Sequence, residues 1–288
     1  MTDNFIILVG AGRSGTTMMR KALAAHSDVA TADFELNYLW CHGNVSLNHD
    51  MLDPDLHYTE QKGKYIREKL EENLRNTGKK KLIEKTVANV LRVSYVHKGL
   101  PEAKFIHIIR DGRGVTASAM KRWTTSYSGS YLFSKSRTIP ITDLPVVAFR
   151  FFKNRIIGKL LSKGRARSWG PRWPGMEEDA KHMSLAALCA KQWKICVETG
   201  MEQCAKLPKS QFMEIRYEEL VQNPVEKFTE IAKFLGISPD DPGFQDYIGS
   251  VITTTSLDKW KEELTDQDLE DFDKIAGPLL RRLGYSQE

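Results

Sequence analysis

The sequence has few cysteines and no long hydrophobic run. Its four cysteines include no closely spaced pair, so they indicate neither a disulfide framework nor a metal site. Cys189, Cys196 and Cys204 recur at intervals of seven and eight residues, which predicts small buried side chains on one helix face. The first residues lack a basic stretch, and their apolar run is too short for a signal or membrane helix. We therefore expect a reduced, cytoplasmic protein that does not bind a membrane.

A strong charge of either sign is absent as well. The chain carries 42 Lys and Arg against 37 Asp and Glu, a formal net charge of +5. This mild surplus fits an anionic small molecule and does not by itself indicate nucleic-acid binding. The hydrophobic content of 41% and the charged content of 27% are typical of a globular protein with a sizeable core. Because no repeat or break in composition divides the chain, we expect one domain over residues 1–288.

Short apolar runs alternate with helical patterns along the chain. The apolar runs predict buried strands at residues 5–9, 81–83, 105–109 and 212–215. The helical patterns that separate them lie at residues 62–76, 112–122, 185–204 and 224–235. This alternation favours an α/β fold with a central, mostly parallel sheet flanked by helices. Residues 41–55 and 123–174 lack a regular pattern, and we expect them to shape the ligand pocket as ordered loops.

Residues 10–17 form a glycine-rich loop, GAGRSGTT, between an expected strand and an expected helix. In this context the backbone N–H groups at the helix N-terminus are suited to hold a phosphate. The spacing fits the Gly-x4-Gly-Lys-Ser/Thr frame of triphosphate-binding loops, except that Thr16 occupies the lysine position. Without that lysine, no obvious side chain reaches a β/γ-phosphate pair. The loop therefore predicts a ligand with a 5′-phosphate other than ATP or GTP.

A second phosphate-binding pattern follows the expected strand at residues 105–109. Arg110 lies at the carboxyl edge of that strand, where open parallel sheets bind their ligands. Ser118 follows eight residues later, about two turns into the next helix. An arginine fork with a nearby hydroxyl can hold a phosphate. Alternatively, Arg110 and Asp111 serve only to cap and neutralise the helix start.

Together, RSGTT at residues 13–17 and IIRDGRGVTAS at residues 108–118 resemble the PAPS-dependent sulfotransferases. The resemblance implies a P-loop-like three-layer fold. It also implies transfer of a sulfuryl group from PAPS (3′-phosphoadenosine 5′-phosphosulfate) to a hydroxyl or amine, which releases PAP and requires no metal. The absent loop lysine then has a reason, because PAPS presents one phosphate with a sulfuryl group rather than a magnesium-bound triphosphate. By this match the 5′ end is held by Gly12, Arg13, Ser14, Gly15, Thr16 and Thr17, and the 3′-phosphate by Arg110 and Ser118.

Later segments extend the resemblance over most of the chain. Residues 83–92 look like the family's second strand and following loop, in which Lys85 would face the transferring group. Tyr217, after the last expected strand, matches a tyrosine near the nucleotide. The tail is similar to that of the tyrosylprotein-sulfotransferase branch, in which a serine and a lysine approach the cofactor. In this sequence those two residues are Ser256 and Lys261.

Sulfuryl transfer needs positive charge at the leaving phosphate and a base at the acceptor. The resemblance implies that Arg13 and Lys85 stabilise the leaving phosphate, with Lys85 as its possible proton donor. In the tyrosylprotein branch a glutamate follows the RSGTT loop as the base. An ungapped match falls on a phenylalanine, and a gap of one residue selects Glu35. Asp33 and His42 stay open as alternatives.

Two other functions also stay open. The loop frame alone would fit a small-molecule kinase, against which stand Thr16 and the lack of a convincing acidic strand end for magnesium. A non-catalytic module that binds PAP or PAPS would keep the same pocket, although the intact Lys85 and Arg110 favour an enzyme. The sequence does not decide between a small molecule, a glycan and a peptide as the acceptor, nor does it fix the oligomeric state.

Overall fold

The computed structural model describes residues 3–32, 35–123 and 169–285. Within these ranges five strands form one sheet in the order β2-β3-β1-β4-β5, and every pairing is parallel. The expected α/β fold is therefore confirmed, and all four apolar runs are strands. The strands are β1 (Phe5–Val9), β2 (Val29–Thr31), β3 (Lys81–Glu84), β4 (Lys104–Ile109) and β5 (Phe212–Arg216).

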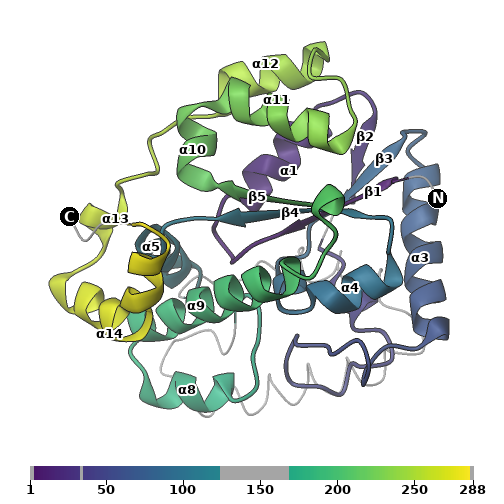
Figure 1. Cartoon of the computed structure of the whole chain (residues 1–288). Helices are drawn as coiled ribbons and strands as arrows, with labels where there is room; N and C mark the ends of the chain where they lie inside the picture. The colour runs from purple at the N-terminus through teal and green to yellow at the C-terminus, as the bar shows by residue number, and fades with distance from the viewer. Residues whose placement is uncertain (1–2, 33–34, 124–168, 286–288) are drawn as a thin grey trace.

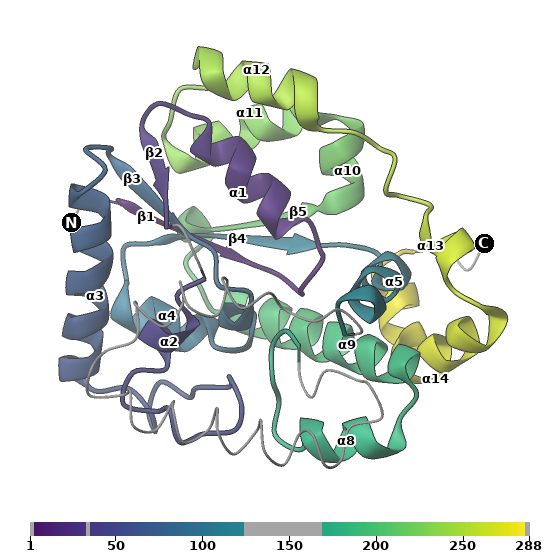
Figure 2. The ribbon, with the colours of Figure 1, turned by 180° about the vertical axis from the view of Figure 1, so that it is seen from behind.

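Helices cover both faces of the sheet and give the fold three layers (Figures 1 and 2). One face carries α1 (Thr16–Ala24), α10 (Tyr217–Gln222), α11 (Pro224–Leu235) and α12 (Pro242–Val251). The other face carries α3 (Glu60–Arg75), α4 (Val93–Gly99), α9 (Leu185–Cys204) and α14 (Asp266–Arg282). The four helical patterns of the sequence correspond to α3, α9, α11 and α5 (Gly112–Trp123).

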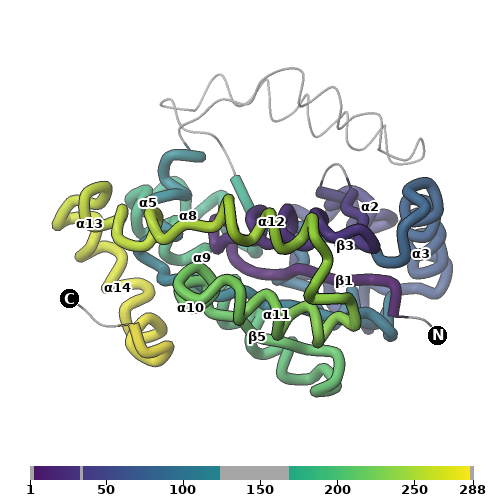
Figure 3. The backbone as a smooth tube through the Cα atoms, turned by 90° about the horizontal axis from the view of Figure 1, so that it is seen from above, coloured from purple at the N-terminus to yellow at the C-terminus, as the bar shows by residue number. Residues whose placement is uncertain are grey.

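The short elements lie around these layers. Figure 3 places α13 and α14 at one end of the molecule and α3 at the other. Residues 41–55 contain only turns and irregular backbone, in line with the expected loop. The remaining elements are α2 (Asn37–Trp40), α8 (Met176–His182), α13 (Trp260–Glu263) and the 3₁₀ turns Val87–Leu91 and Lys209–Gln211.

Alternate residues of β1 belong to two separate hydrophobic cores. Ile6 and Leu8 pack with residues of α1, α10, α11 and α12. Ile7 and Val9 pack with residues of α3, α4, α9 and α14. All five residues of β1 are buried, as expected for the central strand of a parallel sheet. A slip of one residue would exchange the two sets of side chains, so packing fixes where β1 ends and the glycine loop begins.

Cys189, Cys196 and Cys204 lie along α9 as buried free thiols, which confirms the prediction from their spacing. Burial raises the pKa of Cys189 to about 12, so its thiol stays protonated at neutral pH. None of the helices in the described part of the chain has the length and apolar character needed to cross a bilayer.

Asp241 connects α12 to the loop that follows α1. Its carboxylate caps α12 by accepting the N–H of Phe244 at 3.0 Å, and it also accepts the N–H of Ser27 at 3.1 Å. Burial raises the pKa of Asp241, but these hydrogen bonds and the nearby His26 outweigh it and lower the pKa to about 2.

We expect Asp241→Ala to lower the free energy of unfolding by about 1–2 kcal/mol at neutral pH, because the helix cap and the tie to Ser27 are both lost. The depressed pKa sets the pH window. The stabilisation is fully present above the ordinary aspartate pKa of about 3.9 and disappears as the pH falls toward 2. Urea unfolding of both proteins across this range measures the difference, and a difference independent of pH would contradict the assignment.

Candidate active site

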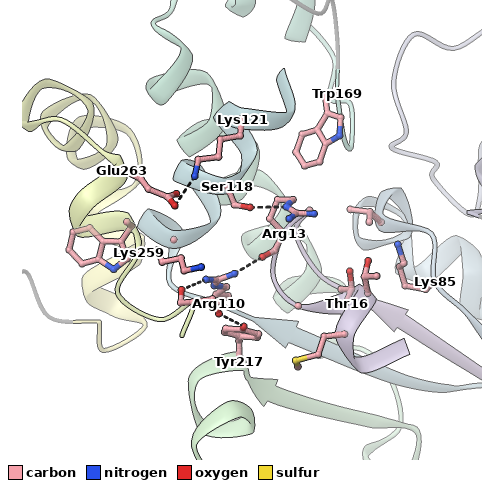
Figure 4. A pocket seen from close by; sticks show the side chains of 18 of the residues that line it. Arg13, Thr16, Lys85, Arg110, Ser118, Lys121, Trp169, Tyr217, Lys259 and Glu263 are labelled. Carbon is pink, nitrogen blue, oxygen red and sulfur yellow. Dashed lines mark hydrogen bonds and ion pairs between the residues drawn. The ribbon is translucent and has the colours of Figure 1, made fainter. Parts of the chain in front are cut away.

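A cavity of about 520 Å³ lies at the carboxyl edge of the sheet, beside the ends of β1, β3 and β4 (Figure 4). It brings together segments that are far apart in the sequence: the glycine loop, the turn after β3, α5, the start of α10, and the tail with α13. Among the described residues that line it, five are cationic and two are carboxylates. The cavity therefore suits an anionic ligand.

The glycine loop makes a tight turn between β1 and α1. Gly15 has a φ of +93°, and a Cβ at this position would lie 2.5 Å from the ring of Tyr217. Arg13 also has a positive φ, +76°, which is uncommon for a residue with a side chain. A Cβ on Gly12 would lie 2.9 Å from the ring of Trp169. The turn brings to the cavity the first N–H groups of α1, which have no carbonyl partners within the helix.

Most of the predicted phosphate-loop residues face this cavity. Ser14 does not: it is fully buried, and its Oγ has no hydrogen-bond partner among the described residues. The loop residues that line the cavity are Gly12, Arg13, Gly15, Thr16 and Thr17.

Arg13 and Arg110 join the glycine loop to α5 and the tail. Arg13 Nε donates to Ser118 Oγ at 2.8 Å. Arg110 donates to the carbonyl oxygen of Arg13 at 3.1 Å and to that of Ser256 at 2.7 Å (Figure 4). The Arg110 guanidinium also stacks on Tyr217, 4.4 Å from the ring centroid, and the Tyr217 and Ser256 hydroxyls are 2.6 Å apart. Five residues predicted as cofactor contacts are thus connected in one network.

The electrostatics of Arg13 favour an anion beside it. Burial within the cavity, together with the positive charges of Arg122 and Arg110, lowers the pKa of Arg13. The guanidinium stays protonated, but its charge is less well stabilised here than in water. A bound phosphate would remove that penalty, because its negative charge stabilises the guanidinium.

Lys85 and Glu35 form a close ion pair. Lys85 Nζ lies 2.6 Å from Glu35 Oε1, and the two side chains are 7% and 31% exposed. Both residues line the cavity. Of the alternative bases, His42 stacks on the ring of a tyrosine and is not among the described lining residues, whereas Asp33 lies outside the described residues.

The tail contributes a lysine that the sequence analysis missed. Lys261, predicted from the family pattern, pairs with Asp258 at 3.3 Å and is not among the described lining residues. Lys259 lines the cavity instead and lies near Arg110 in Figure 4. Residues two apart at a helix start point in different directions, so the phase of α13 decides which lysine faces the cavity. The match to the family pattern gives no information about the phase of α13.

The sequence analysis also missed the ion pair between Lys121 and Glu263. Their charged atoms are 2.7 Å apart, and both residues line the cavity. Trp169 also lines the cavity. It is held by Gln192 of α9, whose Nε2 donates to the carbonyl oxygen of Trp169 at 2.7 Å. In contrast, Trp173 is buried in the core and donates its indole N–H to a carboxylate at 2.7 Å. Of these two tryptophans, only Trp169 is among the described residues that line the cavity.

A parallel sheet, a glycine loop at a helix N-terminus and an arginine–serine pair at the next strand end define a P-loop-like α/β protein. A family model described as the sulfotransferase family matches residues 5–145 and 165–241. The chain therefore belongs to the sulfotransferase family, and the resemblance seen in the sequence is confirmed.

Two protein relatives show how far the likeness extends. The chain is 22% identical to protein-tyrosine sulfotransferase A of Caenorhabditis elegans, over 99% of this chain and 68% of that protein. It is 23% identical to the protein-tyrosine sulfotransferase of Drosophila melanogaster, over 97% of this chain and 51% of that protein. The chain thus spans about half to two thirds of the length of these relatives.

Solved structures share the fold. A sulfotransferase domain from the curacin biosynthetic pathway superposes with a TM-score of 0.56 at 15% identity, over 100% of this chain and 99% of that chain. A sulfotransferase from Mycobacterium avium gives a TM-score of 0.54 at 11% identity, over 98% and 77%. At these identities the comparison shows a common P-loop-like architecture.

We predict that Lys259→Ala weakens PAP binding about tenfold, because it removes a cation that faces the cavity. Lys261→Ala is the matched control: it removes the same charge two residues away, where the side chain pairs with Asp258 outside the cavity. Isothermal titration of both variants with PAP makes the comparison. If Lys261→Ala lost the affinity and Lys259→Ala kept it, the sequence-based assignment would hold and the placement of Lys259 would not matter for binding.

Proposed function

We propose that this protein is a PAPS-dependent sulfotransferase that moves a sulfuryl group to a hydroxyl or amine by in-line transfer. The observation that carries the proposal is the convergence of a glycine loop, an arginine–serine pair and a lysine–glutamate pair on one cavity. The family assignment supports sulfuryl transfer as the general reaction. The use of PAPS and the roles of individual residues are our inference from this geometry.

Two anion positions fit the donor nucleotide. The glycine loop and the N-terminus of α1 suit its 5′-phosphate, because backbone N–H groups bind one phosphate without a lysine at Thr16. Arg110 and Ser118, with Lys259 nearby, suit its 3′-phosphate. Arg13 contacts Ser118 from the loop and so connects the two positions.

The Lys85–Glu35 pair supplies the acid and the base. During transfer, negative charge grows on the oxygen that leaves with the 5′-phosphate, and Lys85 and Arg13 provide positive charge for it. Lys85 can also give that oxygen a proton. Glu35 accepts the proton of the attacking hydroxyl or amine. In the free protein Lys85 Nζ and Glu35 Oε1 lie 2.6 Å apart, so their charges neutralise each other. When a bound phosphate attracts Lys85, Glu35 becomes available to the acceptor.

The acceptor is the least defined part of the proposal. The relatives are named protein-tyrosine sulfotransferases, so a tyrosine-containing peptide is the first acceptor to test, beside small hydroxyl compounds, amines and glycans. Most of residues 123–174, which we expect to shape the acceptor pocket, lie outside the described residues. Independence from metal and a cytoplasmic location stay predictions.

The nucleotide assignment is tested by titration. The protein should bind PAP tightly without magnesium and bind ATP weakly. We expect Ser118→Ala to weaken PAP binding roughly 10–100-fold, because a hydrogen bond to a charged group is lost. It should leave the binding of adenosine 5′-phosphosulfate nearly unchanged, since that nucleotide has no 3′-phosphate.

A suitable control for this titration is Ser250→Ala, which removes an exposed hydroxyl bonded to its own helix backbone. Equal losses for PAP and adenosine 5′-phosphosulfate would contradict a 3′-phosphate site at Ser118. Tight, magnesium-dependent ATP binding would instead favour a kinase.

The base is tested by Glu35→Gln, which keeps the shape of the side chain and removes its ability to accept a proton. We expect PAP release from PAPS to fall by at least about 10²-fold in a panel of hydroxyl and amine acceptors, with PAP affinity nearly intact. Asp33→Asn serves as the comparator. If that variant loses turnover while Glu35→Gln keeps it, Asp33 is the base. A wild-type protein that binds PAP and turns over no acceptor would favour a non-catalytic module.

A further inference from the structure

A buried hydrogen-bond network lies directly behind the Lys85–Glu35 pair. Glu84, the last residue of β3, is only 1% exposed. Its Oε1 accepts the hydroxyl of Thr86 at 2.5 Å, and its Oε2 accepts Nδ2 of Asn89 at 2.7 Å. Both donors are fully buried, and none of these three residues is among those that line the cavity in the described structure. The network therefore serves the site without facing a ligand.

Thr86 connects this carboxylate to the segment that carries Glu35. While its hydroxyl donates to Glu84, the same oxygen accepts the backbone N–H of Leu36 at 2.9 Å. A hydroxyl that donates and accepts at once has a fixed orientation. Leu36 directly follows Glu35, and Lys85 lies between Glu84 and Thr86 in the sequence. The same two residues thus hold the backbone on both sides of the ion pair.

A second tie runs through Asn89 and Arg92. Asn89 Oδ1 accepts Nε of Arg92 at 2.8 Å. Arg92 is fully buried and donates to the side-chain carbonyl of Asn37 and to Cys41 Sγ, which belong to α2 and its end. The positive charge of Arg92 partly offsets the cost of burying the Glu84 carboxylate, whose pKa burial raises. Polar networks whose members are all hydrogen-bonded are rigid, so the start of α2 is fixed relative to β3.

Such support is needed because Glu35 belongs to neither a helix nor a strand. A reactive side chain on an irregular segment is placed accurately only when neighbouring groups hold that segment to a rigid element. Here the rigid element is β3, which pairs with β1 on one side and with β2 on the other. The hydrogen bond from Leu36 to Thr86 ties the backbone beside Glu35 to the residues that directly follow β3.

We infer that Glu84 and Thr86 are positioning residues for sulfuryl transfer, which hold Glu35 and Lys85 against each other without touching either reactant. The catalytic meaning of this inference rests on the proposed function. The positioning itself does not, because the contact between Glu35 and Lys85 can be measured in the free protein. A purely structural network would stabilise the fold and leave that contact unchanged when one hydroxyl is removed.

The test compares Thr86→Val, which removes the hydroxyl at similar size, with Thr86→Ser, which keeps it. Each free protein is labelled with a trace of acetic anhydride, and the acetylation of every lysine is measured by mass spectrometry. We expect Lys85 to react about fivefold faster in Thr86→Val, since an amine released from its carboxylate is less protected. Thr86→Ser should react at the wild-type rate. Lys81, buried on the same strand and paired with Asp3, is the internal control and should not change.

Two results would overturn the inference: unchanged labelling of Lys85 in Thr86→Val, or an equal increase at Lys81, which would mean that β3 loosens as a whole. If Thr86→Val does not fold, Glu84→Gln tests the same network, because one of the two hydrogen bonds to residue 84 is lost, and Lys85 should again react faster. The glutamine amide has one acceptor oxygen where the carboxylate uses two.

Turnover gives a second measurement. With the acceptor panel described above, kcat of Thr86→Val should fall about 10–100-fold while KM for PAPS and the affinity for PAP stay nearly constant, and Thr86→Ser should restore kcat. If the wild-type protein turned over no acceptor, the proposed function would be rejected. The positioning role could still be tested, because the labelling of Lys85 needs no acceptor.

Discussion

The parallel pairing of β1 with β3 and β4 is the constraint on which the site depends. Ile7 of β1 pairs with Glu84 on one side and with Phe105 on the other, so the three strands end at one edge. A different part of the candidate site follows each strand at this edge: the glycine loop follows β1, Lys85 follows β3, and Arg110 follows β4. Because β1 is buried between two cores, its register cannot shift without exchanging their side chains. Packing thereby determines which groups meet in the cavity.

Gathering arginine and lysine side chains in one cavity creates repulsion that the free protein reduces by internal contacts. Lys85 pairs with Glu35, Lys121 pairs with Glu263, and Arg110 donates to two backbone carbonyls. These contacts are with carboxylate or carbonyl oxygens, and phosphate oxygens offer the same kind of acceptor. The arrangement therefore favours an anion over a neutral ligand. It also supplies the positive charge that a lysine in the glycine loop would otherwise contribute.

Sequence patterns sufficed where a functional residue directly follows a clear apolar strand. This holds for the placement of the glycine loop, Lys85 and Arg110 at one edge of the sheet. The sequence patterns did not predict β2, because a strand of three residues is too short to show a recognisable period. The family pattern selected Lys261, whereas Lys259 lines the cavity. The direction of each side chain depends on the phase of α13, which the sequence pattern does not give. The sequence does not show whether Trp169 or Trp173 faces the cavity, because Gln192 of α9 holds Trp169 in place.

The buried carboxylate of Glu84 has a physical cost that packing alone does not explain. Burial raises its pKa, which means that the charged form is disfavoured there, and the hydrogen bond from Thr86 only partly opposes this effect. An apolar side chain of similar volume would fill the same space without that penalty. What an apolar side chain could not do is orient the Thr86 hydroxyl toward the N–H of Leu36. Glu84 is therefore best understood through geometry, since it connects the rigid sheet to Lys85 and Glu35, the proposed acid–base pair.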